Sequence, residues 1–216
     1  MPSDLLPPAD IENSTPKLRR RQADRSALSD ARMIDAAIYL LSRQGVDAVT
    51  LVAVGERAGY SRGLVTRRYG SKAGLLARVL EHLNDTAAAS IRIAESEYCG
   101  LDMIRRLFEG LFASMRETPD EVRARHLLWF HSLEPATEFH ATLERLHRVQ
   151  RRQLENWLRA GQQAGNVRMD IAPVRVAEQL LALSSGLSYQ WLVAPDMPLQ
   201  AVASDLENTL VRWLAP

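Results

Sequence analysis

Residues 50–72 read TLVAVGERAGYSRGLVTRRYGSK, and this stretch decides the fold of the N-terminal region. Threonine is common at the residue that caps the N-terminus of a helix, and glycine is common just after the C-terminus. Thr50 and Gly59 therefore predict a short helix over residues 51–58. Ser61 is placed to cap a second short helix directly after the turn. Two short helices joined by a tight glycine turn indicate a helix-turn-helix, whose second helix enters the major groove of DNA.

Charge is unevenly distributed along the chain. The formal net charge is only +1 over 216 residues. Residues 17–72 nevertheless carry twelve Lys or Arg and five Asp or Glu, a surplus of about +7. A positive electrostatic field at the N-terminal end of the chain favours a polyanionic partner. For a single arginine such as Arg67 or Arg68 the alternative is a solvated surface charge.

Apolar residues recur at helical spacing along the chain, and no stretch has the pattern of a strand. We therefore expect an all-α protein of about nine helices. Residues 1–22 contain four prolines and no apolar periodicity, which predicts a disordered basic arm whose residues 17–21 enter a minor groove or add counterion-release affinity. A three-helix helix-turn-helix domain would cover residues 23–72, and a helical domain residues 73–216. The expected helices span about 26–44, 51–58, 62–68, 71–95, 101–117, 119–133, 135–164, 173–193 and 199–214.

The N-terminal region resembles the TetR family of transcriptional regulators over about fifty residues. The family runs from an Ile-Leu-x-Ala-Ala helix through Gly, Thr and Ala-Gly to a Ser-x-Gly recognition turn and a Ser-Lys opening. The joint occurrence of these pieces is far more specific than any one of them. In this chain they appear at the same spacing as Met33-Ile34-Asp35-Ala36-Ala37, Gly45, Thr50, Ala58-Gly59, Ser61-Arg62-Gly63, Tyr69 and Ser71-Lys72-Ala73-Gly74-Leu75-Leu76.

Two positions depart from the family pattern. Gly55 stands where the family often has alanine. Glycine lowers the stability of the first helix of the pair by about 1 kcal/mol relative to alanine, unless a close helix contact requires its small size. Thr66 stands where the family often has tyrosine, and it replaces an aromatic contact to DNA by a shorter hydroxyl.

The resemblance and the chemistry together assign DNA-binding roles. Thr50 and Ser61 sit at helix N-termini, where hydroxyls and free N–H groups meet phosphates. Arginines of the second helix reach guanine edges or phosphates, and a threonine approaches a thymine methyl. Tyr69 and Lys72 resemble phosphate clamps. The predicted DNA-binding residues are Thr50, Ser61, Arg62, Gly63, Thr66, Arg67, Arg68, Tyr69 and Lys72.

The resemblance implies that residues 73–216 form a ligand-binding and dimerisation domain. Helices 174–193 and 199–214 are apolar enough to build a four-helix interface across a two-fold axis. The alternative is that they only close the core of one chain. Aromatic and sulfur side chains of the middle helices suit a cavity for an apolar effector, although ordinary core packing explains any one of them as well. The predicted pocket residues are Met103, Phe108, Phe112, His126, Trp129, Phe130 and Tyr189.

Other chemistry finds little support in the sequence. Cys99, the single cysteine, excludes an intrachain disulfide and is expected to be buried or half-buried. His140, Glu144 and His147 share a helix face, but no second motif completes a metal site, so we expect an exposed polar face there. No catalytic constellation and no cofactor motif is recognised, and an enzyme is not expected. Without a membrane span or a signal sequence, the expected location is the cytoplasm.

These features predict a homodimeric, sequence-specific DNA-binding regulator that binds operator DNA and is released from it by a small apolar effector. Repression is the usual outcome in the family that the chain resembles. The long helix from about residue 71 to 95 belongs to both domains and would transmit the change. The alternatives are a helical adaptor that binds proteins and a non-catalytic ligand sensor without an operator.

Overall fold

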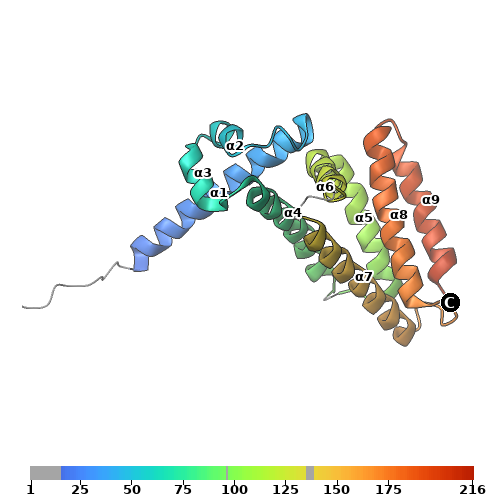
Figure 1. Cartoon of the computed structure of the whole chain (residues 1–216). Coiled ribbons are helices and arrows are strands. Elements are labelled where there is room, and N and C mark those ends of the chain that lie inside the picture. Colours follow the sequence, from blue (N-terminus) through green and yellow to red (C-terminus); the bar gives the residue numbers. More distant parts are fainter. Residues whose placement is uncertain (1–15, 96, 135–138) are drawn as a thin grey trace, which may run out of the picture.

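The structure is a computed structural model that describes residues 16–95, 97–134 and 139–216. Within these ranges every regular element is an α-helix, which confirms the predicted fold class (Figure 1). None of the helices in this part of the chain is long and apolar enough to cross a bilayer. The helices are α1 (Pro16–Gln44), α2 (Leu51–Ala58), α3 (Arg62–Tyr69), α4 (Lys72–Glu95), α5 (Gly100–Glu117), α6 (Pro119–His131), α7 (Phe139–Ala164), α8 (Pro173–Val193) and α9 (Leu199–Leu214).

The first helix starts earlier than the sequence analysis predicts. α1 begins at Pro16, so the expected disordered arm is wrong for residues 16–22, whose backbone is helical. Residues 1–15 lie outside the described residues. Proline suits the first helical turn because its missing N–H would have no partner there. The leucine, arginines and glutamine of residues 18–22 are strong helix formers, so the helix extends through the basic run without needing an apolar stripe.

A first hydrophobic core joins the N-terminal helices to α6. Met33 of α1, Val54 of α2 and Val65 of α3 are fully buried in it. Leu80 of α4 and Leu128 of α6 belong to the same cluster. α1 and α4 therefore pack directly against α6, and α4 runs from the N-terminal region into the C-terminal one (Figure 1).

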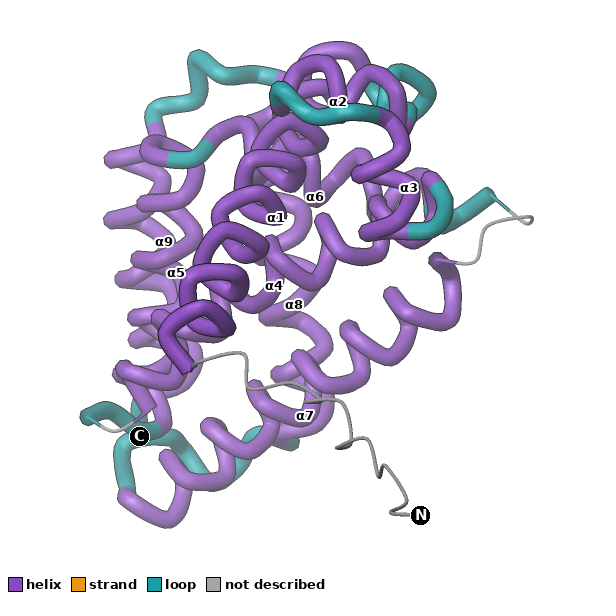
Figure 2. Tube along the Cα trace, turned by 90° about the vertical axis from the view of Figure 1, so that its left-hand side faces the viewer, coloured by secondary structure: helices purple, strands orange, loops and turns teal. Residues whose placement is uncertain are grey.

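A second core holds α5, α7, α8 and α9 together. Phe108, Leu180 and Leu210 are buried in it. α5 begins close to the backbone of α7. A Cβ atom built on Gly161 would lie only 2.6 Å from the Cα atom of Gly100. The small residues at this crossing allow the backbones to approach, and the resulting bundle is seen along another direction in Figure 2.

Two expectations about exposure are wrong. Cys99 is exposed, because it lies in the loop that precedes α5, where the side-chain amide of Asn166 donates to its carbonyl oxygen at 3.2 Å and lies 4.0 Å from its sulfur. On the predicted polar face of α7, His140 and Glu144 are exposed as expected, but His147 is half-buried. Its ring packs edge-on against Trp129 with 5.4 Å between the ring centroids, because the buried side of α7 is wider than the leucine stripe suggests.

A buried histidine connects α6 to α8. The Nδ1 atom of His126 donates to the carbonyl oxygen of Val122 at 2.9 Å, and its Nε2 atom lies 3.1 Å from the hydroxyl oxygen of Ser188. Burial lowers the pKa of His126 from its ordinary value, and burial likewise lowers the pKa of His147. Both rings are therefore held in their neutral form by the folded chain.

This histidine predicts a loss of stability in mild acid. Above the ordinary histidine pKa of about 6.5 the ring is neutral in both folded and unfolded chains, and its protonation does not affect stability. As the pH falls below that value the unfolded chain takes up the proton first, so the free energy of unfolding should fall between about pH 7.5 and 5.5. Urea titrations at both pH values should show a smaller loss for His126→Gln. The exposed His140→Gln control should keep the wild-type loss, and equal losses in the two variants would contradict the assignment.

Candidate DNA-binding interface

The first helix of the motif has the caps that the sequence predicts. The Oγ1 atom of Thr50 accepts a hydrogen bond from the backbone N–H of Ala53 at 3.0 Å. Gly59 ends α2 in the left-handed conformation at φ 77°, and its N–H donates to the carbonyl oxygen of Glu56. Left-handed backbone favours glycine because a Cβ atom would clash there. The predicted bounds of α2 and both of its caps are confirmed.

The second helix presents a continuous exposed face. The Oγ atom of Ser61 accepts from the N–H of Leu64 at 3.3 Å, which confirms the predicted cap. Val65 turns inward and is fully buried. The outward residues are adjacent or one helical turn apart and therefore share a side of α3. These exposed residues are Arg62, Gly63, Thr66 and Arg67.

The capping hydroxyls keep a donor for another partner. Thr50 and Ser61 use an oxygen lone pair to accept from the backbone, and both residues are exposed. A hydroxyl that accepts in this way still has its own hydrogen to donate. Lys72, the first residue of α4, is half-buried and follows α3 after a two-residue turn.

Two of the predicted DNA-binding residues are held within the protein. The hydroxyl of Tyr69 donates to the Oδ1 atom of Asp30 at 2.7 Å, and burial, followed by the hydrogen bond to Asp30, raises the pKa of Tyr69 above its usual range. Arg68 donates to the hydroxyl of Ser29 at 3.1 Å. The guanidinium groups of Arg68 and Arg78 each lie 3.7 Å from Asp30. Asp30 thus ties α3 and α4 to α1. Sequence reasoning missed it, because one acidic residue in a basic segment gives no spacing signal.

Gly55 lies at a close contact between α2 and the turn that follows it, which is the packing role that the sequence analysis considers for this glycine. A Cβ atom built on Gly55 would lie 2.8 Å from the carbonyl oxygen of Tyr60 and 3.4 Å from the backbone nitrogen of Arg62. The residue is buried, and the turn between α2 and α3 folds back over it. The small size of Gly55 therefore lets the turn pack tightly and fixes the start of α3.

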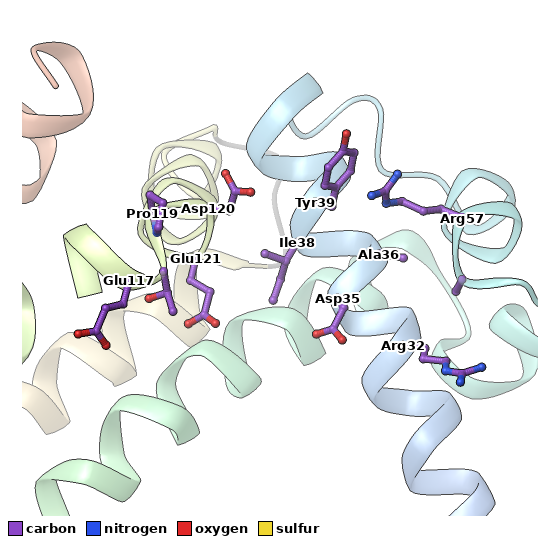
Figure 3. Close-up of a pocket in the computed structure, with 12 residues that line it drawn as sticks. Arg32, Asp35, Ala36, Ile38, Tyr39, Arg57, Glu117, Pro119, Asp120 and Glu121 are labelled. Carbon is purple, nitrogen blue, oxygen red and sulfur yellow. The ribbon is translucent and has the colours of Figure 1, made fainter. Parts of the chain in front are cut away.

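A groove of about 830 Å³, lined largely by polar residues, lies between α1 and the end of α2 on one side and the turn between α5 and α6 on the other (Figure 3). On one side the guanidinium carbon of Arg57 lies 3.2 Å from the centre of the Tyr39 ring. Arg43 of α1 forms an ion pair with Asp120 of α6 at 3.1 Å. The two regions therefore meet through polar contacts as well as through the first core. No sequence pattern pointed to this groove.

The structure distributes the predicted pocket residues among different places. Met103, Phe108 and Phe112 lie in the second core, and the two phenylalanines also border a groove of about 210 Å³ between α5 and α9. His126 and Trp129 are neighbours, with ring centroids 4.9 Å apart. A third group is an exposed pair, in which the rings of Phe130 and Tyr189 lie 5.7 Å apart on the surface.

A capped pair of short helices, with an exposed arginine-bearing face and a larger helical domain behind it, defines a helix-turn-helix transcription regulator. Comparisons with known proteins support this class. Residues 33–79 match the model of bacterial regulatory proteins of the tetR family, and residues 101–215 match that of the BetI-type transcriptional repressor C-terminal domain. The chain belongs to the TetR family, whose members are transcription regulators rather than enzymes.

Individual relatives are moderately similar. The chain is 25% identical over 203 residues to the HTH-type transcriptional regulator TtgR of Pseudomonas putida, covering 90% of this chain and 92% of that protein. It is 31% identical over 144 residues to the HTH-type transcriptional regulator BetI of Burkholderia mallei, covering 65% and 68%. The fold is shared with the structure of a putative TetR-family transcriptional regulator from Rhodococcus sp., at a TM-score of 0.71 and 21% identity, covering 85% and 97%.

Proposed function

We propose that the chain acts in the cytoplasm as a homodimeric repressor, which leaves its operator when a small apolar effector binds the C-terminal domain. The observation that carries the proposal is the exposed face of α3, which presents Arg62 and Arg67 beside a hydroxyl and a glycine. The match to a BetI-type repressor C-terminal domain supports the repressing role. A solved structure of similar fold is described as a complex of SmeT with triclosan, which supports control by a small molecule.

The DNA contacts divide by chemistry. Arg62, Thr66 and Arg67 are proposed to reach base edges in the major groove, and Gly63 lets the backbone approach. Thr50, Ser61 and Lys72 would bind phosphates. Because Asp30 already holds Arg68 and Tyr69, we assign these two residues chiefly to the orientation of α3, with phosphate contact as a secondary role. The same list of residues thus contains groups that read DNA and groups that position the reading helix.

The dimer interface is proposed to lie on α8 and α9, which form the edge of the C-terminal domain opposite α2 and α3 (Figure 1). Val174, Tyr189 and Val193 of α8 and Val211 of α9 are large apolar residues that the single chain leaves exposed. Large apolar side chains that a single chain leaves exposed are a common feature of surfaces that bind another protein. Two-fold pairing through them would place two α3 helices for successive major grooves, about 34 Å apart.

Substitution of Gly186 tests this interface. A Cβ atom at Gly186 meets nothing within 4 Å in the single chain, so Gly186→Arg should leave the fold of each subunit intact. Across a two-fold axis a long charged side chain at this site would separate the subunits, and light scattering should give the mass of a monomer. Gly110→Arg, at an equally open position on α5, is the matched control and should remain a dimer. A dimeric Gly186→Arg variant would exclude this surface.

Transmission from the C-terminal domain to DNA is proposed to pass through α4 and α6. Both helices contribute to the first core, which also contains Val65 of the recognition helix. An effector that favours one arrangement of α4 and α6 would change the spacing of the two α3 helices and so select against the DNA-bound state. The shift requires only that the effector bind the two arrangements with different affinity.

A mobility-shift assay with genomic fragments at several salt concentrations tests the proposed function. A regulator should bind a small set of fragments even in the presence of excess random DNA, and its affinity should fall as the salt concentration rises. An adaptor or a sensor without an operator would show no fragment preference at any salt concentration, and that result would refute operator binding.

A further inference from the structure

Four buried polar atoms without partners gather on α6 and α7. They are the Nε atom of Arg125, the Nε1 atom of Trp129, the Nε2 atom of His147 and the Oε1 atom of Gln150. Arg125 and Trp129 are one turn apart on α6, and His147 and Gln150 are one turn apart on α7. The contact between the rings of Trp129 and His147, at 5.4 Å, joins the two helix faces. Buried polar groups are normally hydrogen-bonded, so this cluster calls for an explanation.

The positive charge of Arg125 makes the cluster favour an anion over a neutral or cationic ligand. Its guanidinium donates to the carbonyl oxygen of Leu83 at 3.1 Å, and no carboxylate of the described residues lies within ion-pair distance of it. Burial lowers the pKa of Arg125, and Glu121 offsets this only in part, which agrees with a cation removed from water. A buried charge without a counter-ion is costly, whereas an anion placed against it forms charge-assisted hydrogen bonds.

We propose that this cluster recognises the effector, and that the apolar effector of the proposed function carries one carboxylate on an apolar or aromatic body. The proposal rests on the proposed function, in which a small molecule binds the C-terminal domain. The carboxylate pairs with Arg125, and the body lies against the rings of Trp129 and His147. The Oε1 atom of Gln150 accepts from a hydroxyl or N–H of the ligand. Leu127 and Leu146, half-buried against the first core, supply apolar surface nearby.

The position of the cluster connects it to the DNA-binding region. Arg125 donates to α4, the helix that continues from the helix-turn-helix, and Trp129 packs against the first core. On the other side Trp129 touches His126, which is hydrogen-bonded to Ser188 of α8. A ligand held by Arg125 would therefore be linked through this side chain to both α4 and α6, the helices that the proposed transmission uses.

The test compares carboxylates with their neutral counterparts on the full chain. Benzoate, 4-hydroxybenzoate, indole-3-acetate and decanoate are titrated by calorimetry, together with the matched amides and with benzyltrimethylammonium as a cation. At least one carboxylate should bind, and its amide should bind about 10- to 100-fold more weakly because the charge-assisted bonds are lost. Failure of all four acids, or equal binding of the amides or the cation, would overturn the proposal.

Variants separate recognition from folding. Arg125→Met should reduce carboxylate affinity by about 10- to 100-fold and leave amide affinity unchanged. Arg123→Met, at an exposed position on the same helix, should bind as the wild type does. If Arg125→Met does not fold, Arg125→Lys keeps the charge but loses the planar fork, and should weaken carboxylate binding by about 3- to 10-fold. Unchanged carboxylate affinity in the folded Arg125 variant refutes the assignment.

The same titrations distinguish this inference from the proposed function. A carboxylate that binds through Arg125 but leaves DNA affinity unchanged would support the recognition site and refute its role as an effector site. Conversely, a ligand that releases DNA but binds equally well to the Arg125→Met variant would support the regulator and overturn the carboxylate proposal.

Discussion

The Arg62→Ala/Lys72→Ala double variant is expected to lose DNA affinity by about 100-fold or more without a fall in melting temperature. Arg62 is exposed at the N-terminal end of α3, the end that lies nearest the base edges in a major-groove complex. Lys72 follows α3, and its amine is proposed to bind a phosphate. Neither side chain is paired with a described residue, so their removal leaves no buried partner behind. Fluorescence anisotropy with a duplex that the wild type retains gives the affinity, and calorimetry gives the melting temperature.

The matched control changes the same amount of charge elsewhere. Arg123 and Arg152 are exposed arginines of α6 and α7. The Arg123→Ala/Arg152→Ala variant should alter affinity by less than about threefold, since only the long-range field changes. Equal losses in the two double variants would show that net charge, rather than the face of α3, governs binding.

The Gly55→Val variant is expected to lower the free energy of unfolding by about 1–3 kcal/mol and to weaken DNA binding by more than about tenfold. The carbonyl oxygen of Tyr60 lies 2.8 Å from the site of the new Cβ atom, so the turn between α2 and α3 must move. Because Arg62 begins α3 directly after this turn, the recognition helix moves with it. Denaturant titration measures the first effect, and anisotropy measures the second.

Gly110→Val provides the comparison for this variant. Gly110 is exposed on α5, and a Cβ atom there meets nothing within 4 Å. Valine at this position should leave stability close to that of the wild type, because it replaces glycine in a helix without a clash. If Gly55→Val proved as stable as Gly110→Val, the tight turn would not depend on the glycine.

Local chemistry made much of the motif predictable. The caps Thr50 and Ser61, the left-handed Gly59 and the short lengths of α2 and α3 all follow from hydrogen-bonding groups within a few residues of one another. Once Val65 is recognised as a packing residue, the roughly 3.6-residue repeat of a helix predicts which side chains of α3 point outward. The strength of local propensity also explains the early start of α1, which the absence of an apolar pattern concealed.

Contacts between distant segments were not predictable. The bonds from Asp30 to Tyr69, and from Arg125 to the carbonyl oxygen of Leu83, join residues that no sequence spacing relates. The same holds for the polar groove between the two regions. Aromatic composition indicated a pocket but did not assign its lining, because burial in a core and exposure on a surface both use phenylalanine and tyrosine. The exposed ring of Phe130 is an example.

Selection of binding sites from a random duplex pool by the purified full chain tests the central claim most directly. If two copies of α3 read successive major grooves, the selected sequences should share a two-fold symmetric element with half-site centres about one helical turn apart. The Arg62→Ala/Lys72→Ala variant should select no such element. A wild-type pool without any enriched symmetric sequence would contradict the proposed reading of DNA by α3.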